Sequence, residues 1–261
     1  MAKRSLAGQA AILTGASGGI GEALAHALAA QGVRVALSAR RVSRLEQVAA
    51  DITSAGGEAL TIAADVTDDA QVEALVQRVV ETWGRIDIVI ANAGIYVQTP
   101  SAELDLASLQ QAMEINYFGA MRTALAVLPQ MQQQGNGHLV FMASLGAKIP
   151  IPGDGPYVAS KAALSGIAQV MRQDLAKEGI SVTIIYPGRI DTPMLDHLRT
   201  SWISPKVSPE KLAQKIINGL ERRQRRIIYP FTGYLYVLRE LSPAVGDWLI
   251  RVLRLQGWPA S

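Results

Sequence analysis

Residues 10–24 read AAILTGASGGIGEAL, which is an apolar run, a glycine-rich turn and the start of an amphipathic stretch. Small residues in such a turn let the backbone approach a pyrophosphate, whose charge is met by amide groups at the N-terminus of the following helix. The glycine spacing is Gly-x-x-x-Gly-x-Gly, and a turn of this kind can also be purely structural. Its position between a strand and a helix favours dinucleotide binding, with contacts expected from Gly15, Ser17, Gly18, Gly19, Ile20 and Gly21.

The rest of the chain continues this alternation of short and long apolar patterns. Runs rich in Val, Ile and Ala alternate with amphipathic stretches, which is typical of βα units around a parallel sheet. The runs are continuously apolar, as expected for strands that helices bury on both faces. We therefore predict an α/β fold with a doubly wound parallel sheet of about seven strands and helices on both faces. The expected strands are residues 10–15, 34–39, 58–64, 86–92, 138–143, 181–186 and 226–229.

The composition excludes several classes of function. The 261 residues include no cysteine, which excludes disulfides, a thiolate nucleophile and cysteine-based metal sites. The three histidines are scattered without other ligands at metal-binding spacing, so no metal is expected. The net charge is only +3, and basic residues concentrate in two short arginine groups, at 40–44 and 222–226, with no aromatic residues interleaved in the first, which disfavours a nucleic-acid partner. No signal peptide pattern precedes the first strand, so a cytoplasmic location is the default.

Three polar residues beyond the middle of the chain have a spacing that suits carbonyl chemistry. Twelve residues separate Ser144 from Tyr157, and Lys161 lies four residues after Tyr157. On a helix, the side chains of Tyr157 and Lys161 therefore project from the same face. A nearby ammonium favours a phenolate, so we expect Lys161 to lower the pKa of Tyr157 from its usual value of about 10. Ser144 can then hold a carbonyl oxygen while Tyr157 exchanges a proton with it.

The end of the second expected strand bears on the type of cofactor. A cofactor without a 2′-phosphate usually meets an acidic residue there, whereas this chain has Ser38, Ala39, Arg40 and Arg41. Arginine pairs well with a 2′-phosphate, so NADP(H) is favoured over NAD(H). The alternative is that Arg40 and Arg41 are solvated loop residues.

With these motifs assembled, the chain resembles the classical short-chain dehydrogenase/reductase family over about residues 7–230. The family's Thr-Gly-x-x-x-Gly-x-Gly turn is matched by Thr14 to Gly21, and its adenine-side Asp-Val pair by Asp65 and Val66. Its Asn-Asn-Ala-Gly motif is matched by Asn92, Ala93 and Gly94, with Ala91 in place of the first Asn. The remaining matches are the active-site residues Asn116, Ser144, Tyr157 and Lys161, and the Pro-Gly motif with its downstream threonine, Pro187, Gly188 and Thr192.

The resemblance implies a Rossmann-like fold and a hydride transfer between a nicotinamide and a carbonyl or alcohol carbon. Tyr157 is then the general acid or base, and Ser144 donates a hydrogen bond to the substrate oxygen. Lys161 binds the nicotinamide ribose and continues a proton relay towards Asn116. Members of the family commonly pair through helices equivalent to residues 103–133 and 157–178, so we also expect a homo-oligomer.

The segment after Gly188 indicates the kind of substrate. In the family this segment closes over the substrate, and here it contains the apolar residues Met194, Leu195, Leu198, Trp202 and Ile203. We therefore expect a lipophilic ketone, aldehyde or secondary alcohol. The alternative is that these side chains only pack the segment on the core.

We expect residues 1–230 to form the dinucleotide-binding and catalytic domain, and residues 231–261 to form a C-terminal helical extension packed on it. Within the extension, Val245, Trp248, Leu249 and Val252 follow helical spacing, and arginines precede the segment. It can therefore cover the substrate cleft, form a subunit contact, or lie on an anionic membrane surface. It lacks the run of about 20 apolar residues that would span a bilayer.

Two functions of different classes remain open at this point. The first is an NADP(H)-dependent oxidoreductase. The second is a non-catalytic NADP(H)-binding redox sensor or membrane-associated scaffold. The complete set Asn116, Ser144, Tyr157 and Lys161 argues for the enzyme.

Overall fold

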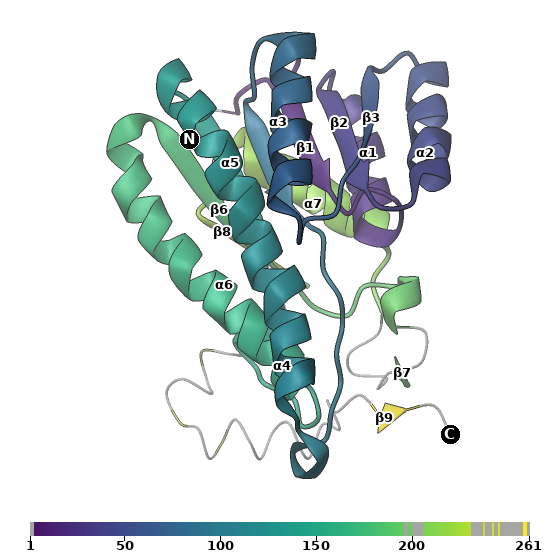
Figure 1. Cartoon of the computed structure of the whole chain (residues 1–261), viewed down its shortest axis with the longest axis vertical. Helices are drawn as coiled ribbons and strands as arrows, with labels where there is room; N and C mark the ends of the chain where they lie inside the picture. Colours follow the sequence, from purple (N-terminus) through teal and green to yellow (C-terminus); the bar gives the residue numbers. More distant parts are fainter. Residues whose placement is uncertain are drawn as a thin grey trace.

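The computed structural model describes residues 3–195, 198–199, 206–230, 237, 242, 245 and 258–259. Seven strands form one sheet in the order β3-β2-β1-β4-β5-β6-β8, and every neighbouring pair is parallel (Figure 1). The strands are β1 (Ala10–Thr14), β2 (Arg34–Ala39), β3 (Ala59–Ala63), β4 (Ile88–Ala91), β5 (Gly137–Met142), β6 (Ile180–Pro187) and β8 (Arg226–Tyr229). The predicted doubly wound parallel sheet is thus confirmed, and each strand lies within two residues of its expected bounds.

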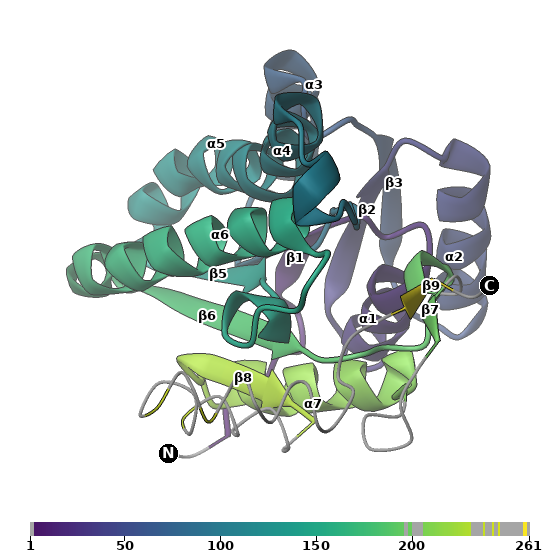
Figure 2. The same cartoon turned by 90° about the horizontal axis from the view of Figure 1, so that it is seen from below.

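Helices cover both faces of the sheet, as the end-on view in Figure 2 shows. Apolar side chains of α1 (Gly19–Ala29), α2 (Val42–Ser54) and α7 (Pro209–Glu221) pack with one face of the sheet. Those of α3 (Asp69–Trp83), α5 (Gly119–Gln134) and α6 (Gly155–Asp174) pack with the other. The two clusters are largely aliphatic, because the strands alternate Val, Ile, Leu and Ala towards both sides.

Local sequence signals explain where several helices begin and end. Asp68 caps α3 by accepting a hydrogen bond from the backbone amide of Gln71. Ser208 caps α7 in the same way, with Pro209 in its first turn. Gly84 ends α3 in the left-handed conformation that glycine adopts without steric cost.

The helical segment that follows β4 changes its pitch in the middle. α4 (Leu106–Met113) runs into a π-helical turn, Glu114–Phe118, which leads directly into α5. Short 3₁₀ turns lie at Ser101–Glu103, Leu145–Ala147, Leu175–Glu178 and Pro193–Leu195. A π turn inserts one residue into the helical ladder and often occurs at functional sites. Here it contains Asn116, whose side chain is fully buried.

Most of the expected C-terminal extension lies outside the described residues, as do the side chains of Leu198, Trp202, Ile203, Trp248, Leu249 and Val252. The helix predicted around residues 244–255, and its membrane contact, therefore stay predictions. A two-stranded antiparallel pair joins β7 (Leu198–Arg199) to β9 (Trp258–Pro259) through their backbones. This pairing brings residues 258–259 beside the segment that follows β6. No helix in the described part of the chain is long and apolar enough to cross a membrane.

Candidate active site and cofactor cavity

One cavity of about 570 Å³ lies at the carboxyl ends of the central strands. In a doubly wound sheet this is the position where ligands bind. Its walls contain every predicted cofactor-binding residue and three of the four predicted catalytic residues. They are Gly15, Ser17, Gly18, Gly19, Ile20, Gly21, Arg40, Arg41, Asp65, Val66, Asn92, Ala93, Gly94, Ser144, Tyr157, Lys161, Pro187, Gly188 and Thr192.

The glycine-rich turn connects β1 to α1 and packs tightly against the end of β4. Gly15 has φ +68°, and a Cβ there would meet the Cα of Ala93 at 2.8 Å. A Cβ on Gly21 would collide with the backbone carbonyl oxygen of Gly15. Asn92 fixes the turn from the other side, because its Nδ2 donates to the carbonyls of Thr14 (3.0 Å) and Gly15 (3.2 Å). Because these glycines have no side chains, the backbone of the turn itself lines the cavity.

The outer part of the cavity carries positive charge. Nη2 of Arg41 donates to the carbonyl and to Oγ of Ser17, at 3.2 and 3.1 Å, so Arg41 lies directly over the glycine-rich turn. Arg40 is mostly exposed and forms a 3.6 Å ion pair with Asp65. Oγ of Ser38 is buried on the same wall and has no hydrogen-bond partner among the described residues. An orphaned hydroxyl and two guanidinium groups fit the ribose and phosphate end of a dinucleotide.

Asp65 is held as an anion beside this positive region. Its Oδ1 accepts hydrogen bonds from the backbone amide (3.0 Å) and the hydroxyl (2.9 Å) of Thr67. The backbone hydrogen bond from Thr67 is the main reason why the pKa of Asp65 lies below its usual value, with a smaller contribution from Arg40. The carboxylate can therefore accept hydrogen bonds from an adenine or ribose group at neutral pH.

The three polar residues Ser144, Tyr157 and Lys161 lie together at the inner end of the cavity. Ser144 follows β5, and its Oγ accepts a hydrogen bond of 3.0 Å from the backbone amide of Gly146. Tyr157 and Lys161 project from the first turns of α6, with Nζ of Lys161 at 6.0 Å from the centre of the Tyr157 ring. Nζ donates to the carbonyl of Met142 at 2.8 Å, so a backbone carbonyl fixes the lysine in place.

The predicted lowering of the Tyr157 pKa by Lys161 is not found in this arrangement. Burial raises the pKa of Tyr157, the hydrogen bond with Ser144 opposes that rise, and the charge of Asp154 adds to it. Burial also lowers the pKa of Lys161 to about 8. Desolvation disfavours the charged forms of both groups, and Nζ of Lys161 donates its hydrogen bond to the carbonyl of Met142.

Asn116 is the one predicted catalytic residue that does not line the cavity. Its Oδ1 accepts from the amide of Ile95 at 2.8 Å, and its Nδ2 donates to the carbonyl of Ile95 and to Oγ of Ser160, both at 3.0 Å. It lies behind Gly94: a Cβ on Gly94 would be 2.8 Å from Oδ1 of Asn116 and 3.3 Å from Nζ of Lys161. Oδ1 of Asn116 and Nζ of Lys161 therefore both lie beside the bare Cα of Gly94.

A second polar group in the cavity was missed from the sequence. The hydroxyl of Tyr96 donates to Oδ1 of Asp154 at 2.5 Å, and the side chain of Gln98 approaches the same oxygen at 3.4 Å. Asp154 is only 6% exposed, and burial raises its pKa. Arg189 also lines the cavity and interacts electrostatically with Tyr96 and Asp154. Arg189 directly follows Gly188, and Tyr96 and Asp154 lie within three positions of Gly94 and Tyr157, so closeness to the motifs was the available signal.

Apolar side chains form the part of the wall nearest the polar residues. They come from the segment after β5 and the segment after β6, namely Leu145, Ile149, Ile151, Met194 and Leu195. Met194 and Leu195 belong to the predicted apolar segment. This part of the cavity can therefore accept a hydrocarbon group next to a carbonyl.

Comparisons with known proteins agree with this geometry. Residues 9–202 match a family model described as short chain dehydrogenase. A fatty acyl-CoA reductase of Acinetobacter baylyi is 31% identical over 252 residues, which are 96% of this chain and 85% of that protein. A short-chain type dehydrogenase/reductase from Mycobacterium marinum superimposes with a TM-score of 0.80 at 30% identity, covering 86% of this chain and 94% of that chain. A 7α-hydroxysteroid dehydrogenase complexed with NADH and a 7-oxo bile acid gives a TM-score of 0.80 at 27% identity, covering 85% and 92%.

Proposed function

The chain belongs to the short-chain dehydrogenase/reductase family of oxidoreductases, and from this premise we propose that it is an NADP(H)-dependent enzyme acting on a lipophilic ketone or aldehyde, or on the matching secondary alcohol. One observation carries the proposal. The phenol of Tyr157, the hydroxyl of Ser144 and the ammonium of Lys161 share one cavity with the glycine-rich turn, so a bound dinucleotide and a carbonyl group can meet there.

The preference for NADP(H) is supported by the outer wall of the cavity. Arg40 and Arg41 lie there beside the buried hydroxyl of Ser38, and no acidic residue ends β2. A 2′-phosphate would gain charge-assisted hydrogen bonds from the two guanidinium groups. With NAD(H), the same groups would meet only a neutral ribose.

The cofactor, when bound, supplies or accepts the hydride at its nicotinamide. Tyr157 gives its proton to the carbonyl oxygen during reduction and removes the proton of the alcohol during oxidation. Ser144 accepts a hydrogen bond from Gly146 through its oxygen, so its own hydrogen can be donated to the substrate oxygen where charge develops.

Lys161 and Asn116 support Tyr157 from behind. With a pKa of about 8, Lys161 is mostly protonated at neutral pH and can donate to a ribose hydroxyl as well as to Met142. Asn116 holds the backbone at Ile95, which fixes the segment around Gly94. In this proposal, Asn116 positions the backbone around Gly94, which lies beside Lys161, and the proton of Tyr157 is replaced by way of Lys161.

A lipophilic substrate is supported by the apolar wall formed by Leu145, Ile149, Ile151, Met194 and Leu195. Two of the similar proteins have names or ligands of this chemical type, a fatty acyl-CoA reductase and a 7α-hydroxysteroid dehydrogenase. The polar group Tyr96, Asp154 and Arg189 lies on the same cavity. We therefore propose an amphipathic carbonyl compound rather than a pure hydrocarbon chain.

We also propose a homo-oligomer. Several large apolar side chains are exposed on the helical segments predicted to pair: Leu106 (74%), Phe118 (45%), Leu125 (55%) and Val170 (50%). These exposed side chains support an interface on the two helical segments. Light scattering after size-exclusion chromatography measures the mass directly, and a mass of 27.9 kDa would contradict the proposal.

The test of the enzyme proposal is oxidation of NADPH, with NADH as the control cofactor, over ketones and aldehydes of increasing chain length. Wild type, Tyr157→Phe and Tyr117→Phe are compared, because Tyr117 packs against the core away from the cavity. We expect turnover that prefers NADPH, increases with apolar length, is lost in Tyr157→Phe and is kept in Tyr117→Phe. Tight NADPH binding without turnover on any substrate would favour the sensor or scaffold instead.

A further inference from the structure

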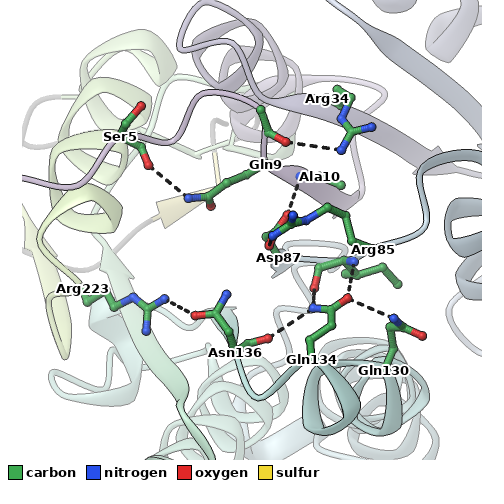
Figure 3. Close-up of polar contacts among 12 residues, drawn as sticks. Ser5, Gln9, Ala10, Arg34, Arg85, Asp87, Gln130, Gln134, Asn136 and Arg223 are labelled. Carbon is green, nitrogen blue, oxygen red and sulfur yellow. Dashed lines mark hydrogen bonds and ion pairs between the residues drawn. The ribbon is translucent and has the colours of Figure 1, made fainter.

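A second cavity, of about 230 Å³, lies at the amino ends of β1, β4 and β5. It is therefore at the opposite end of these strands from the cofactor cavity, and the two share no lining residue. Its walls come from the segment before β1, the starts of β4 and β5, and the end of α7. Figure 3 shows Gln9, Asp87, Asn136 and Arg223 arranged around its open centre.

The one carboxylate on the wall of this cavity is already neutralised. Asp87 is 3% exposed, and Arg85 pairs with both of its oxygens, through Nε at 2.8 Å and Nη2 at 2.6 Å. The backbone amide of Ala10 adds a further hydrogen bond of 2.9 Å to Oδ2. Asp87 therefore has little negative charge left to offset the cations on the opposite wall.

Arg223 contributes the first of these cations. Its Nη1 donates to Oγ of Ser181 at 3.0 Å and its Nη2 to Oδ1 of Asn136 at 2.7 Å, and both acceptors are neutral. It has no ion pair with a carboxylate among the described residues. Arg223 is also the only non-glycine residue in the described part of the chain with a positive φ, +46°. The backbone of Arg223 thus adopts an uncommon conformation, and the guanidinium is held at the cavity wall by its hydrogen bonds to Ser181 and Asn136.

Arg4 contributes the second cation, from the N-terminal segment. Its backbone amide donates to the carbonyl of Glu221 at 2.9 Å, whereas its guanidinium makes no hydrogen bond or ion pair with any described residue. The carboxylate of Glu221 is paired with Lys3 at 2.8 Å. The two guanidinium groups are close enough that the charge of Arg4, together with burial, lowers the pKa of Arg223. The two positive charges on the wall of this cavity repel each other, and an anion bound between them would offset that repulsion.

The remaining polar lining is neutral and includes a free donor. The hydroxyl of Thr183 donates to the carbonyl of Gln224 at 2.5 Å, so Nε2 of His138 must be the donor in its 2.8 Å contact with Thr183. His138 is buried as the neutral ring. Because Oδ1 of Asn136 accepts from Arg223, its Nδ2 hydrogens are left without an acceptor among the described residues.

We propose that this cavity is a binding site for a small oxyanion, such as inorganic phosphate, held between the guanidinium groups of Arg4 and Arg223 with a hydrogen bond from Asn136. The volume suits such an ion together with a few waters, each of which takes about 30 Å³. Because Arg4 and Arg223 come from the two ends of the fold, the bound ion ties the N-terminal segment to the turn between α7 and β8. The proposal is independent of the proposed function.

The test is calorimetric titration of inorganic phosphate into the full chain, with chloride at matched ionic strength as the reference titrant. We expect phosphate to bind wild type, and its dissociation constant to rise about tenfold or more in both Arg4→Gln and Arg223→Gln. Arg222→Gln removes the same charge from an exposed neighbour outside the cavity and should bind like wild type.

The side chain of Arg4 makes no hydrogen bond or ion pair with any described residue, so Arg4→Gln should fold and decides the question even if Arg223→Gln unfolds. Phosphate that binds Arg4→Gln as tightly as wild type would overturn the proposal. So would a loss of binding only in Arg41→Gln, because that result would place the phosphate in the cofactor cavity.

Discussion

The hydroxyl of Tyr96 donates a hydrogen bond of 2.5 Å to the carboxylate of Asp154. The ring of Tyr96 also meets the ring of Tyr157 edge to face, with 5.0 Å between their centres. A buried carboxylate and the proposed catalytic phenol are thus joined through a single side chain. Ser144, Lys161 and Arg189 are the other polar or charged groups on this part of the cavity. The protonation of Tyr157 is therefore expected to depend on Asp154.

Asp154→Asn should lower the pKa of Tyr157. The negative charge of Asp154 disfavours the phenolate, so removing it favours deprotonation. Reduction needs the protonated phenol and should decline at a lower pH than in wild type, while oxidation should reach its plateau at a lower pH. The pH profile of kcat in both directions measures this shift. Asp51→Asn, on the exposed face of α2, is the matched control. If the pH profiles of kcat for Asp154→Asn coincide with those of wild type, the prediction is contradicted.

Arg41→Gln should weaken NADPH binding more than NADH binding. The change removes a guanidinium that lies over Ser17, and a lost charge-assisted hydrogen bond raises KM for NADPH by about tenfold or more. KM for NADH should change by less than about threefold, since its ribose carries no phosphate. Arg44→Gln is the control, because Arg44 pairs with Glu22 outside the cavity. Equal effects on both cofactors would show that Arg41 does not read the 2′-phosphate.

Gly21→Ala should damage both stability and cofactor binding. The added methyl group would collide with the carbonyl of Gly15, and forcing it in costs about 1–3 kcal/mol of unfolding free energy. Gly166→Ala adds the same group to α6, where nothing lies within 4 Å, and should be neutral or stabilising by up to about 1 kcal/mol. Urea unfolding and NADPH fluorescence measure the two effects. Normal NADPH affinity in Gly21→Ala would mean that the turn can open without cost.

His138 should make the protein less stable in mild acid. Burial lowers the pKa of His138 from 6.5 to about 3 in the folded state, so the unfolded chain binds a proton that the native state does not bind. Stability is therefore lost as the pH falls from about 6.5 towards 3. His138→Gln should lose less stability than wild type between pH 7.5 and 5. Urea midpoints at the two pH values provide the measurement.

The strands were predictable because helices bury them on both faces, which leaves continuous apolar runs such as Ile88–Ala91 in the sequence. The glycine-rich turn and the spacing from Ser144 to Lys161 were predictable because each depends on residues close in the chain. These signals were enough to bring almost all proposed site residues onto one cavity.

Other parts of the site depend on contacts between distant segments. The bond from Lys161 to the carbonyl of Met142 uses the backbone of another element, which side-chain spacing does not reveal. Asp154 meets Tyr96 across 58 positions of sequence, and neither residue forms a motif alone. The π turn around Asn116 was not predictable either, because one inserted residue hardly changes the apolar period of a helix.

The position of β1 in the sheet sets the order in which parts of the fold can form while the chain is being synthesised. β1 lies between β2, which follows it closely, and β4, which begins only at Ile88. The glycine-rich turn is closed from the β4 side, because Asn92 and Ala93 donate to Thr14. A nascent chain can therefore pair β1 with β2 early on the ribosome. Its glycine-rich turn takes its final shape only after the residues following β4 have left the exit tunnel.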